Sequence, residues 1–184
     1  MQLLLLMTTR RLLQLFLLIS AVATTSAAAA LYPPGHDPWP DDERALVAFK
    51  AKISSDSGAL ASWNQSSSYC SWEGVTCGRR HRWRVVALNL SSQGLAGTIS
   101  PAIGNLTFLR LLDLSYNSLQ GEIPASIGSL RRLGSIDLGL NMHTGIIPSN
   151  ISRCISLREM HIYSNKGMQG TSQLRLATCH RSQF

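Results

Sequence analysis

The chain has 184 residues, of which 45% are hydrophobic and 15% are charged. This hydrophobic fraction is close to the globular average and excludes a wholly disordered chain. Lysine and arginine number 17 against 10 aspartate and glutamate residues, which gives a formal net charge of +7. The length allows one domain with a tail and is too short for a kinase or an α/β barrel beside another domain.

The first thirty residues are typical of a secretory signal peptide. Arg10 and Arg11 precede an apolar stretch over 12–22, and small residues that suit cleavage follow at 26–30. The alternative is an uncleaved anchor helix, because 12–31 approaches the length that spans a bilayer. We predict a signal peptide over 1–30, a linker over 31–40 and a secreted product whose cysteines meet an oxidising environment.

An amphipathic helix is expected after the linker. Acidic residues at 41–43 suit a helix N-terminus, and Leu46, Phe49 and Ile53 have the spacing of one buried helix face. Cys70 and Cys77 follow, in the stretch CSWEGVTC. Their spacing is not that of a catalytic C-x-x-C dithiol, and no histidine pair accompanies them to form a zinc site.

Arginines gather in the segment over 79–84, which precedes the first repeat. One interpretation is a site for an anionic partner, such as a pectin-like wall polymer or an acidic peptide. We favour the other interpretation, a solvated loop. A nucleic-acid partner is not expected, because the run lacks an element that enters a groove.

A 24-residue repeat organises the chain over 85–170. Leu109, Leu133 and Leu157 lie 24 residues apart. The pattern LxxLxLxxN with this period is the leucine-rich repeat, in which stacked coils share one continuous core. The other repeated columns are Asn117, Asn141 and Asn165; Gly97, Gly121 and Gly145; and Ile99, Ile123 and Ile147.

Each repeated residue has an expected role within its coil. Asn117 lies where the strand turns, so its amide can satisfy backbone groups and stack on the amides of neighbouring coils. Gly121 allows a backbone geometry that a Cβ atom would forbid, and Pro124 suits an edge-like extended segment. Ile127 and Leu130 are expected to fill the coil interior.

The stretch LQGEIP at 119–124 resembles the plant-specific class of leucine-rich repeats, and this resemblance covers about 85–170. The region before it resembles the N-terminal cap of plant leucine-rich repeat receptor-like kinases: a helix, then Trp63-Asn64, then C-x-W-x-G-V-x-C. The amino-acid sequence of 97–106 and 121–130 most resembles the immune-receptor branch of that family. The resemblance implies a cap over 41–84 that is closed by a Cys70–Cys77 disulfide.

The predicted fold class is therefore an α/β leucine-rich repeat solenoid of about four coils with a helical, disulfide-closed N-terminal cap. Cys154 takes the interior column of Leu106 and Leu130 and is expected to be a buried free thiol, with a bond to Cys179 as the alternative. The pattern stops after 170, and 171–184 is expected to be an irregular tail. The chain is interpreted either as a short secreted product or as a receptor truncated before its transmembrane and kinase parts.

No catalytic, cofactor or metal site is indicated, since the histidines are scattered and no kinase signature occurs. Recognition is instead expected on the strand face, where side chains of successive strands form one array about 5 Å apart. The predicted binding-face residues are Arg110, Asp113, Ser115, Tyr116, Ser135, Asp137, Leu140, Arg158, Glu159, His161 and Tyr163.

Four Asn-x-Ser/Thr sequons predict glycosylation in a secreted chain, at Asn64, Asn89, Asn105 and Asn150. Asn105 and Asn150 are expected towards the back of the coils. Asn89 is expected on the strand face, where a glycan would obstruct binding.

The resemblance implies an extracellular module that recognises a peptide or protein ligand, or a co-receptor, in plant signalling or defence. Its location would be the plasma membrane if the full product is a receptor kinase. One alternative is a secreted inhibitor of microbial wall-degrading enzymes, similar to the polygalacturonase-inhibiting proteins, although the small number of coils counts against it. The other alternative is a non-functional receptor fragment.

Overall fold

The computed structural model describes residues 41–81 and 83–169. The predicted signal peptide, linker and tail, and Cys179, lie outside them. The elements in chain order are α2 (Asp41–Lys50), β1 (Ile53–Ser55), η2 (Tyr69–Ser71), β2 (Val75–Cys77), β3 (Val85–Asn89), β4 (Ala96–Thr98), η3 (Pro101–Asn105), β5 (Leu111–Asp113), β6 (Ser118–Glu122), η4 (Ala125–Ser129), β7 (Ser135–Asp137), β8 (Asn141–Gly145), η5 (Ser149–Arg153), β9 (Glu159–His161) and β10 (Asn165–Met168).

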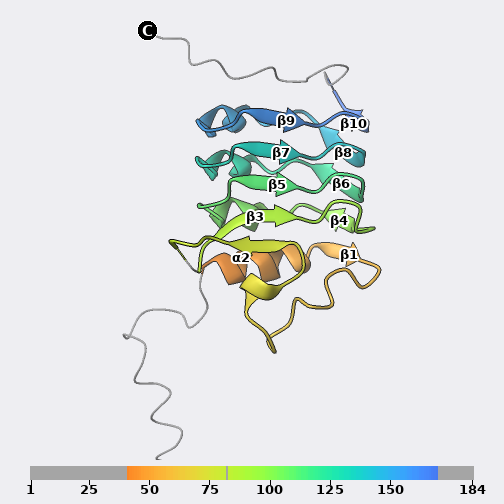
Figure 1. The fold of residues 1–184 in the computed structure, drawn as a ribbon. Helices are drawn as coiled ribbons and strands as arrows, with labels where there is room; N and C mark the ends of the chain where they lie inside the picture. Colours follow the sequence, from red (N-terminus) through yellow and green to blue (C-terminus); the bar gives the residue numbers. More distant parts are fainter. Residues whose placement is uncertain (1–40, 82, 170–184) are drawn as a thin grey trace, which may run out of the picture. The chain divides into compact units, whose positions relative to one another are not determined.

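Each coil of the repeat passes through one strand of each of two sheets, and the first three coils then form a 3-10 turn (Figure 1). The first sheet has the order β2-β3-β5-β7-β9, and the second has the order β1-β4-β6-β8-β10. Strands of successive coils pair in parallel. The predicted leucine-rich repeat solenoid of about four coils is confirmed, and its second sheet was not predicted from the sequence.

The leucines of the repeat fill the space between the sheets and the 3-10 turns. Leu88, Leu112, Ile136 and Met160 lie in register on neighbouring strands of the first sheet. All four are at most 1% exposed, as are Ile127 and Leu130 in the 3-10 region. Pro124 has the expected extended backbone and forms the N-cap of η4, where its carbonyl accepts from the Ile127 amide.

Three repeated asparagines join each coil to the coil before it. Each amide group donates to a carbonyl of the preceding coil and accepts from an amide of that coil, at 2.8 to 3.0 Å. The bonds therefore reach backbone groups of the previous coil, rather than the neighbouring side-chain amide. For Asn117, Asn141 and Asn165 respectively, the carbonyls are those of Leu90, Leu114 and Leu138, and the amides are those of Leu95, Leu119 and His143.

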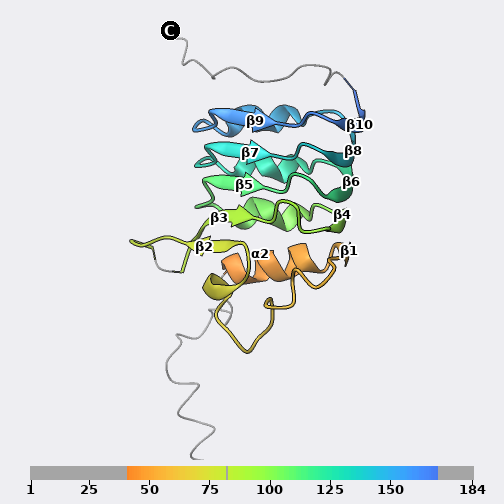
Figure 2. The ribbon, with the colours of Figure 1, turned by 45° about the vertical axis from the view of Figure 1, so that its right-hand side comes forward.

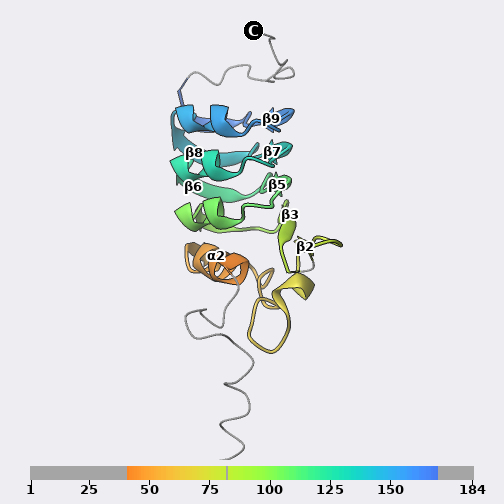
Figure 3. The ribbon, with the colours of Figure 1, turned by 90° about the vertical axis from the view of Figure 1, so that its left-hand side faces the viewer.

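Helix α2 ends earlier than the apolar spacing predicted. It covers Asp41–Lys50, while Ile53 belongs to β1. Strand β1 pairs antiparallel with β4 and places Ile53 opposite Gly97. It thus covers the edge of the second sheet, which would otherwise expose unpaired backbone groups. The helix itself packs on η3, in line with the stacked 3-10 turns (Figure 3).

The cap has its own aromatic core and the predicted disulfide. Trp63 and Trp72 stack with ring centroids 5.3 Å apart, and both indole nitrogens donate to backbone carbonyls. The Cys70–Cys77 disulfide is present, with Cα atoms 5.4 Å apart. Burial, together with the charges of nearby acidic residues, raises the pKa of Tyr69 to about 12. Its hydroxyl therefore remains a neutral donor, bonded to the carbonyl of Trp83.

One buried carboxylate fastens the cap to the first repeat strand. Asp42 is 1% exposed, and its Oδ2 accepts from the Val85 amide at 2.6 Å. Its Oδ1 forms an ion pair with Arg84 at 3.0 Å. The Arg84 guanidinium also donates to Thr107 of the next coil. A single acid in the first turn of α2 therefore fixes where β3 begins.

A buried histidine interrupts the leucine column of the second sheet. His143 is 0% exposed and takes the place that Leu95 and Leu119 hold in the two preceding coils. Its Nδ1 lies 3.3 Å from the Gly121 carbonyl, which can only accept, so Nδ1 carries the proton. Its Nε2 has no hydrogen-bond partner among the described residues. Burial lowers the pKa of His143, and the bond to Gly121 opposes that shift.

We expect the replacement His143→Leu to raise the free energy of unfolding by about 1–3 kcal/mol, because it removes a buried acceptor without a partner. The unfolded chain gains a proton below the ordinary pKa of 6.5 while the folded chain still excludes it. Stability should therefore fall by up to about 1.4 kcal/mol per pH unit below that value, down to the folded pKa. Urea unfolding between about pH 7 and about pH 5 measures both effects. An unchanged pH slope in the leucine variant would contradict this assignment.

Candidate functional site

The candidate site is the outer face of the first sheet, which we call the strand face (Figure 2). Its strands lie in register, so equivalent positions of each coil form columns. One column contains Asn89, Asp113, Asp137 and His161. With about 4.8 Å between neighbouring strands, a bound segment can contact several of these side chains at once.

The acidic column is ordered by bonds to its own turns. Asp113 and Asp137 each use Oδ1 to accept the amide two residues further on, at 3.1 and 2.8 Å. Asn89 accepts in the same way from Ser91. The second oxygen of Asp137 lies 3.1 Å from Nδ1 of His161, whose side chain is 43% exposed. The carboxylates are thus held in place, and Asp137 also holds His161 on the face.

Aromatic side chains lie beside this column. Tyr116 is 58% exposed and Tyr163 is 45% exposed. The Tyr163 ring lies over Gly139, where a Cβ atom would come within 3.1 Å of it. Aromatic side chains that are exposed yet held in position are typical anchors of protein interfaces.

The structure corrects one predicted binding-face residue. Ser115 is 4% exposed and its hydroxyl donates to Asp113, so it supports the face without being available on it. Leu140 is half-buried at a bend with a φ of 53°, and its part in binding stays a prediction. Leu111 was missed: it is 36% exposed and shares a column with Ser135 and Glu159. Its place outside the LxxLxL positions was the signal that could have identified it.

The remaining predicted residues lie at the surface of the strand face. Arg110, Arg158 and Glu159 are exposed, and Ser135 is half-buried and donates to Glu159 at 3.2 Å. Cys154 does not contribute to the face, because it is 5% exposed and donates to the Ile127 carbonyl. Burial raises the pKa of its thiol.

The four sequon asparagines differ in position. Asn64 and Asn105 are exposed in the cap and at the end of η3, and Asn150 is half-buried in η5. Asn89 is exposed on the strand face at the end of β3. A glycan on Asn89 would stand directly beside Asp113 and compete with a ligand there.

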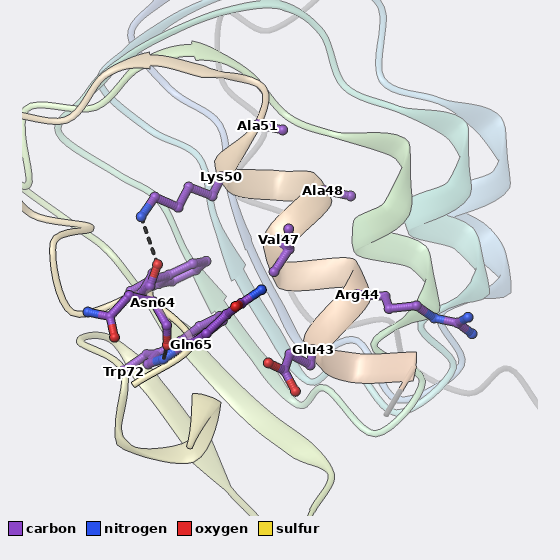
Figure 4. A pocket seen from close by; sticks show the side chains of 10 residues that line it. Glu43, Arg44, Val47, Ala48, Lys50, Ala51, Asn64, Gln65 and Trp72 are labelled. Atoms are coloured by element: carbon purple, nitrogen blue, oxygen red, sulfur yellow. Dashed lines mark hydrogen bonds between the residues drawn. The ribbon is translucent and has the colours of Figure 1, made fainter. Parts of the chain in front are cut away.

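Apart from the strand face, a hollow of about 500 Å³ lies on the cap, between α2 and the segment around 64 (Figure 4). Val47 is 51% exposed in its wall, and Lys50 bridges it by donating to the carbonyls of Leu60 and Trp63. Burial raises the pKa of Glu43 at its rim. Its apolar lining offers few oriented polar groups, so the strand face is the better candidate for specific recognition.

Comparison with known proteins agrees with this architecture. Residues 40–78 match the leucine rich repeat N-terminal domain, and residues 108–130 match the leucine rich repeat. The ectodomain of the receptor kinase SOBIR1 from Arabidopsis thaliana is 34% identical, with a TM-score of 0.57, over 68% of this chain and 67% of that one. The chain belongs to the plant leucine-rich repeat receptor kinase ectodomains. The predicted resemblance is confirmed.

Other members of this ectodomain family are also similar. The kinase EFR of Arabidopsis thaliana is 57% identical over 39% of the chain, and Xa21 of Oryza sativa subsp. japonica is 53% identical over 39%. The chain spans only 7% and 8% of these two relatives. The BIR3–SERK2 complex from Arabidopsis thaliana is 36% identical with a TM-score of 0.59, over 66% of both chains. The PEPR1–AtPEP1 structure is 30% identical with a TM-score of 0.61, over 67% of this chain and 18% of that one.

The regions matched in these ectodomains are ligand-binding modules, not catalytic ones. Within the described part of the chain, no three histidine, cysteine or acidic side chains are grouped closely enough to hold a metal ion. No helix in 41–81 or 83–169 is long and apolar enough to cross a membrane.

Proposed function

We propose that this chain is an extracellular recognition module that binds a peptide or protein ligand through the strand face. The observation that carries the proposal is the pair of exposed tyrosines, Tyr116 and Tyr163, beside the ordered Asp137–His161 pair. Such a surface combines aromatic anchors with fixed polar groups, the combination that interfaces favour. The proposed module consists of a cap over 41–84 and repeats over 85–170.

The relatives support this proposal by what they bind. SERK2 was solved in complex with BIR3, and the PEPR1 structure includes AtPEP1. By analogy, the ligand of this chain is an extracellular peptide or a co-receptor ectodomain. The chain spans only a small share of the length of EFR and Xa21. A role in signalling or defence, which would belong to a whole receptor, is therefore proposed for this chain by analogy.

Selection from a random peptide library on the immobilised chain tests the proposal. We expect enriched peptides to lose at least about tenfold in affinity for the double variant Tyr116→Ala/Tyr163→Ala, equivalent to about 1.4 kcal/mol. The matched control is Met142→Ala/Ile146→Ala, which removes side chains that are 57% and 66% exposed away from the strand face. No enrichment, or equal loss in both double variants, would contradict recognition by the strand face.

A further inference from the structure

A basic groove lies where the cap meets the strand face. It has a volume of about 740 Å³ and an apolar floor that includes Val86 and Leu111. Among the described residues, none that lines it is acidic. Its five basic side chains come from the segment after β2 and from the two ends of the coil over 109–132, and they are Arg79, Arg80, His81, Arg110 and Arg132.

The charge of this groove is not neutralised by the described residues. Arg84 lies nearby but forms an ion pair with Asp42. Within the described part of the chain, the four groove arginines have no carboxylate within 4.0 Å. Gathering four like charges around one hollow costs free energy and focuses the potential there, so the groove attracts anions.

Phe108 holds the groove in shape. The guanidinium carbon atoms of Arg132 and Arg84 lie over its ring, at 4.0 and 4.2 Å from the centroid. The His81 ring meets it edge-on, with centroids 4.9 Å apart. Since one ring face has no room for two guanidinium groups, both faces are covered. The groove is therefore preorganised, and it offers no free aromatic face on which a sugar ring could stack.

We propose that this groove binds a carboxylate-bearing segment of an extended peptide. The carboxylate lies between the arginines, whose planar donors suit two-pronged bonding to it. A neighbouring apolar side chain of the peptide lies on Val86 and Leu111. The proposal rests on the proposed function, because Arg110 and Leu111 make the groove continuous with the strand face. The groove adds that the ligand is acidic, a property that the strand face alone does not indicate.

Fluorescence anisotropy with three labelled probes tests the groove. The probes are an octapeptide of alternating glutamate and leucine, its counterpart with glutamine in place of glutamate, and trigalacturonate. We expect the acidic peptide to bind at least about tenfold more tightly than the other two, and less tightly as salt rises. We expect Arg79→Ser/Arg80→Ser and Arg110→Ser each to lower its affinity at least about tenfold.

The matched control is Arg131→Ser/Arg153→Ser, which removes two exposed arginines that do not line the groove. An equal loss in this control would show diffuse attraction and overturn the proposal, as would equal binding of the acidic and glutamine peptides. Tighter binding of trigalacturonate would overturn the peptide assignment. If the anisotropy measurement contradicts the groove, the peptide selection and its loss in the tyrosine double variant still stand. The groove proposal and the proposed function can therefore be rejected separately.

Discussion

Replacing Asn141 by alanine is expected to lower the free energy of unfolding by about 2–4 kcal/mol. The substitution leaves the Leu119 amide without its side-chain partner, and it removes one of two amide donors to the Leu114 carbonyl, which keeps the bond from Asn117. Asn141 is only 6% exposed, so water does not readily replace it. Each buried backbone group left unsatisfied costs about 1–3 kcal/mol, and the whole fold of such a domain is worth about 5–15 kcal/mol.

Gln93 provides the matched control, because it takes the asparagine position of the first coil and is only half-buried. The variant Gln93→Ala is expected to cost less than about 1 kcal/mol. Urea unfolding followed by circular dichroism measures both variants, and hydrogen exchange at Leu119 reports the broken bond directly. Similar losses for the two variants would show that the asparagine bonds are not what joins the coils.

The replacement Gly97→Ala is expected to cost about 3 kcal/mol or more. Gly97 has a φ of 134°, and a Cβ atom there would lie 2.2 Å from the Lys52 carbonyl oxygen and 2.9 Å from Ile53 Cα. Both contacts are with backbone, which cannot rotate away. The strand pair β1–β4 must therefore separate, and the cap loses its hold on the second sheet.

The variant Gly58→Ala distinguishes the two causes of this loss, which are backbone strain at a positive φ and the steric clash of the added Cβ atom. Its φ is 87°, yet a Cβ atom there would meet nothing within 4 Å. Gly58→Ala thus carries only the backbone strain, about 1–2 kcal/mol. Thermal or urea unfolding of both variants gives the difference due to the clash. If Gly97→Ala cost no more than Gly58→Ala, the close approach of β1 to β4 would be wrong.

The repeat was predictable from the sequence because the residues that recur every 24 positions include leucines, whose role in a repeat is to fill the core. A leucine that recurs every 24 residues must face a shared core, and the structure buries Leu109 and Leu133 completely. The helix end was less predictable. Ile53 continues the helical spacing, but backbone pairing with Gly97 outweighs that local pattern. The second sheet depends on contacts between coils, which a single coil's sequence does not express.

The candidate site was predictable only in outline. Column positions follow from the period, which placed Asp113 and Asp137 side by side. Exposure within a column does not follow, because it depends on local bonds such as that of Ser115 to Asp113. The arginine run over 79–84 suggested an anionic partner as one interpretation, but the groove itself was not predictable, since Arg79 and Arg132 are far apart in the sequence and meet only when the cap lies against the strands.

The bonds that the repeated asparagines form between coils all run in one direction along the chain, from each coil to its predecessor. A 24-residue unit therefore contains the side chain that completes the unit before it, and offers backbone groups to the unit after it. If a whole unit is duplicated or deleted, each pair of neighbouring coils still has an asparagine side-chain amide to bridge them. Genetic gain and loss of coils is in this way compatible with folding at each step.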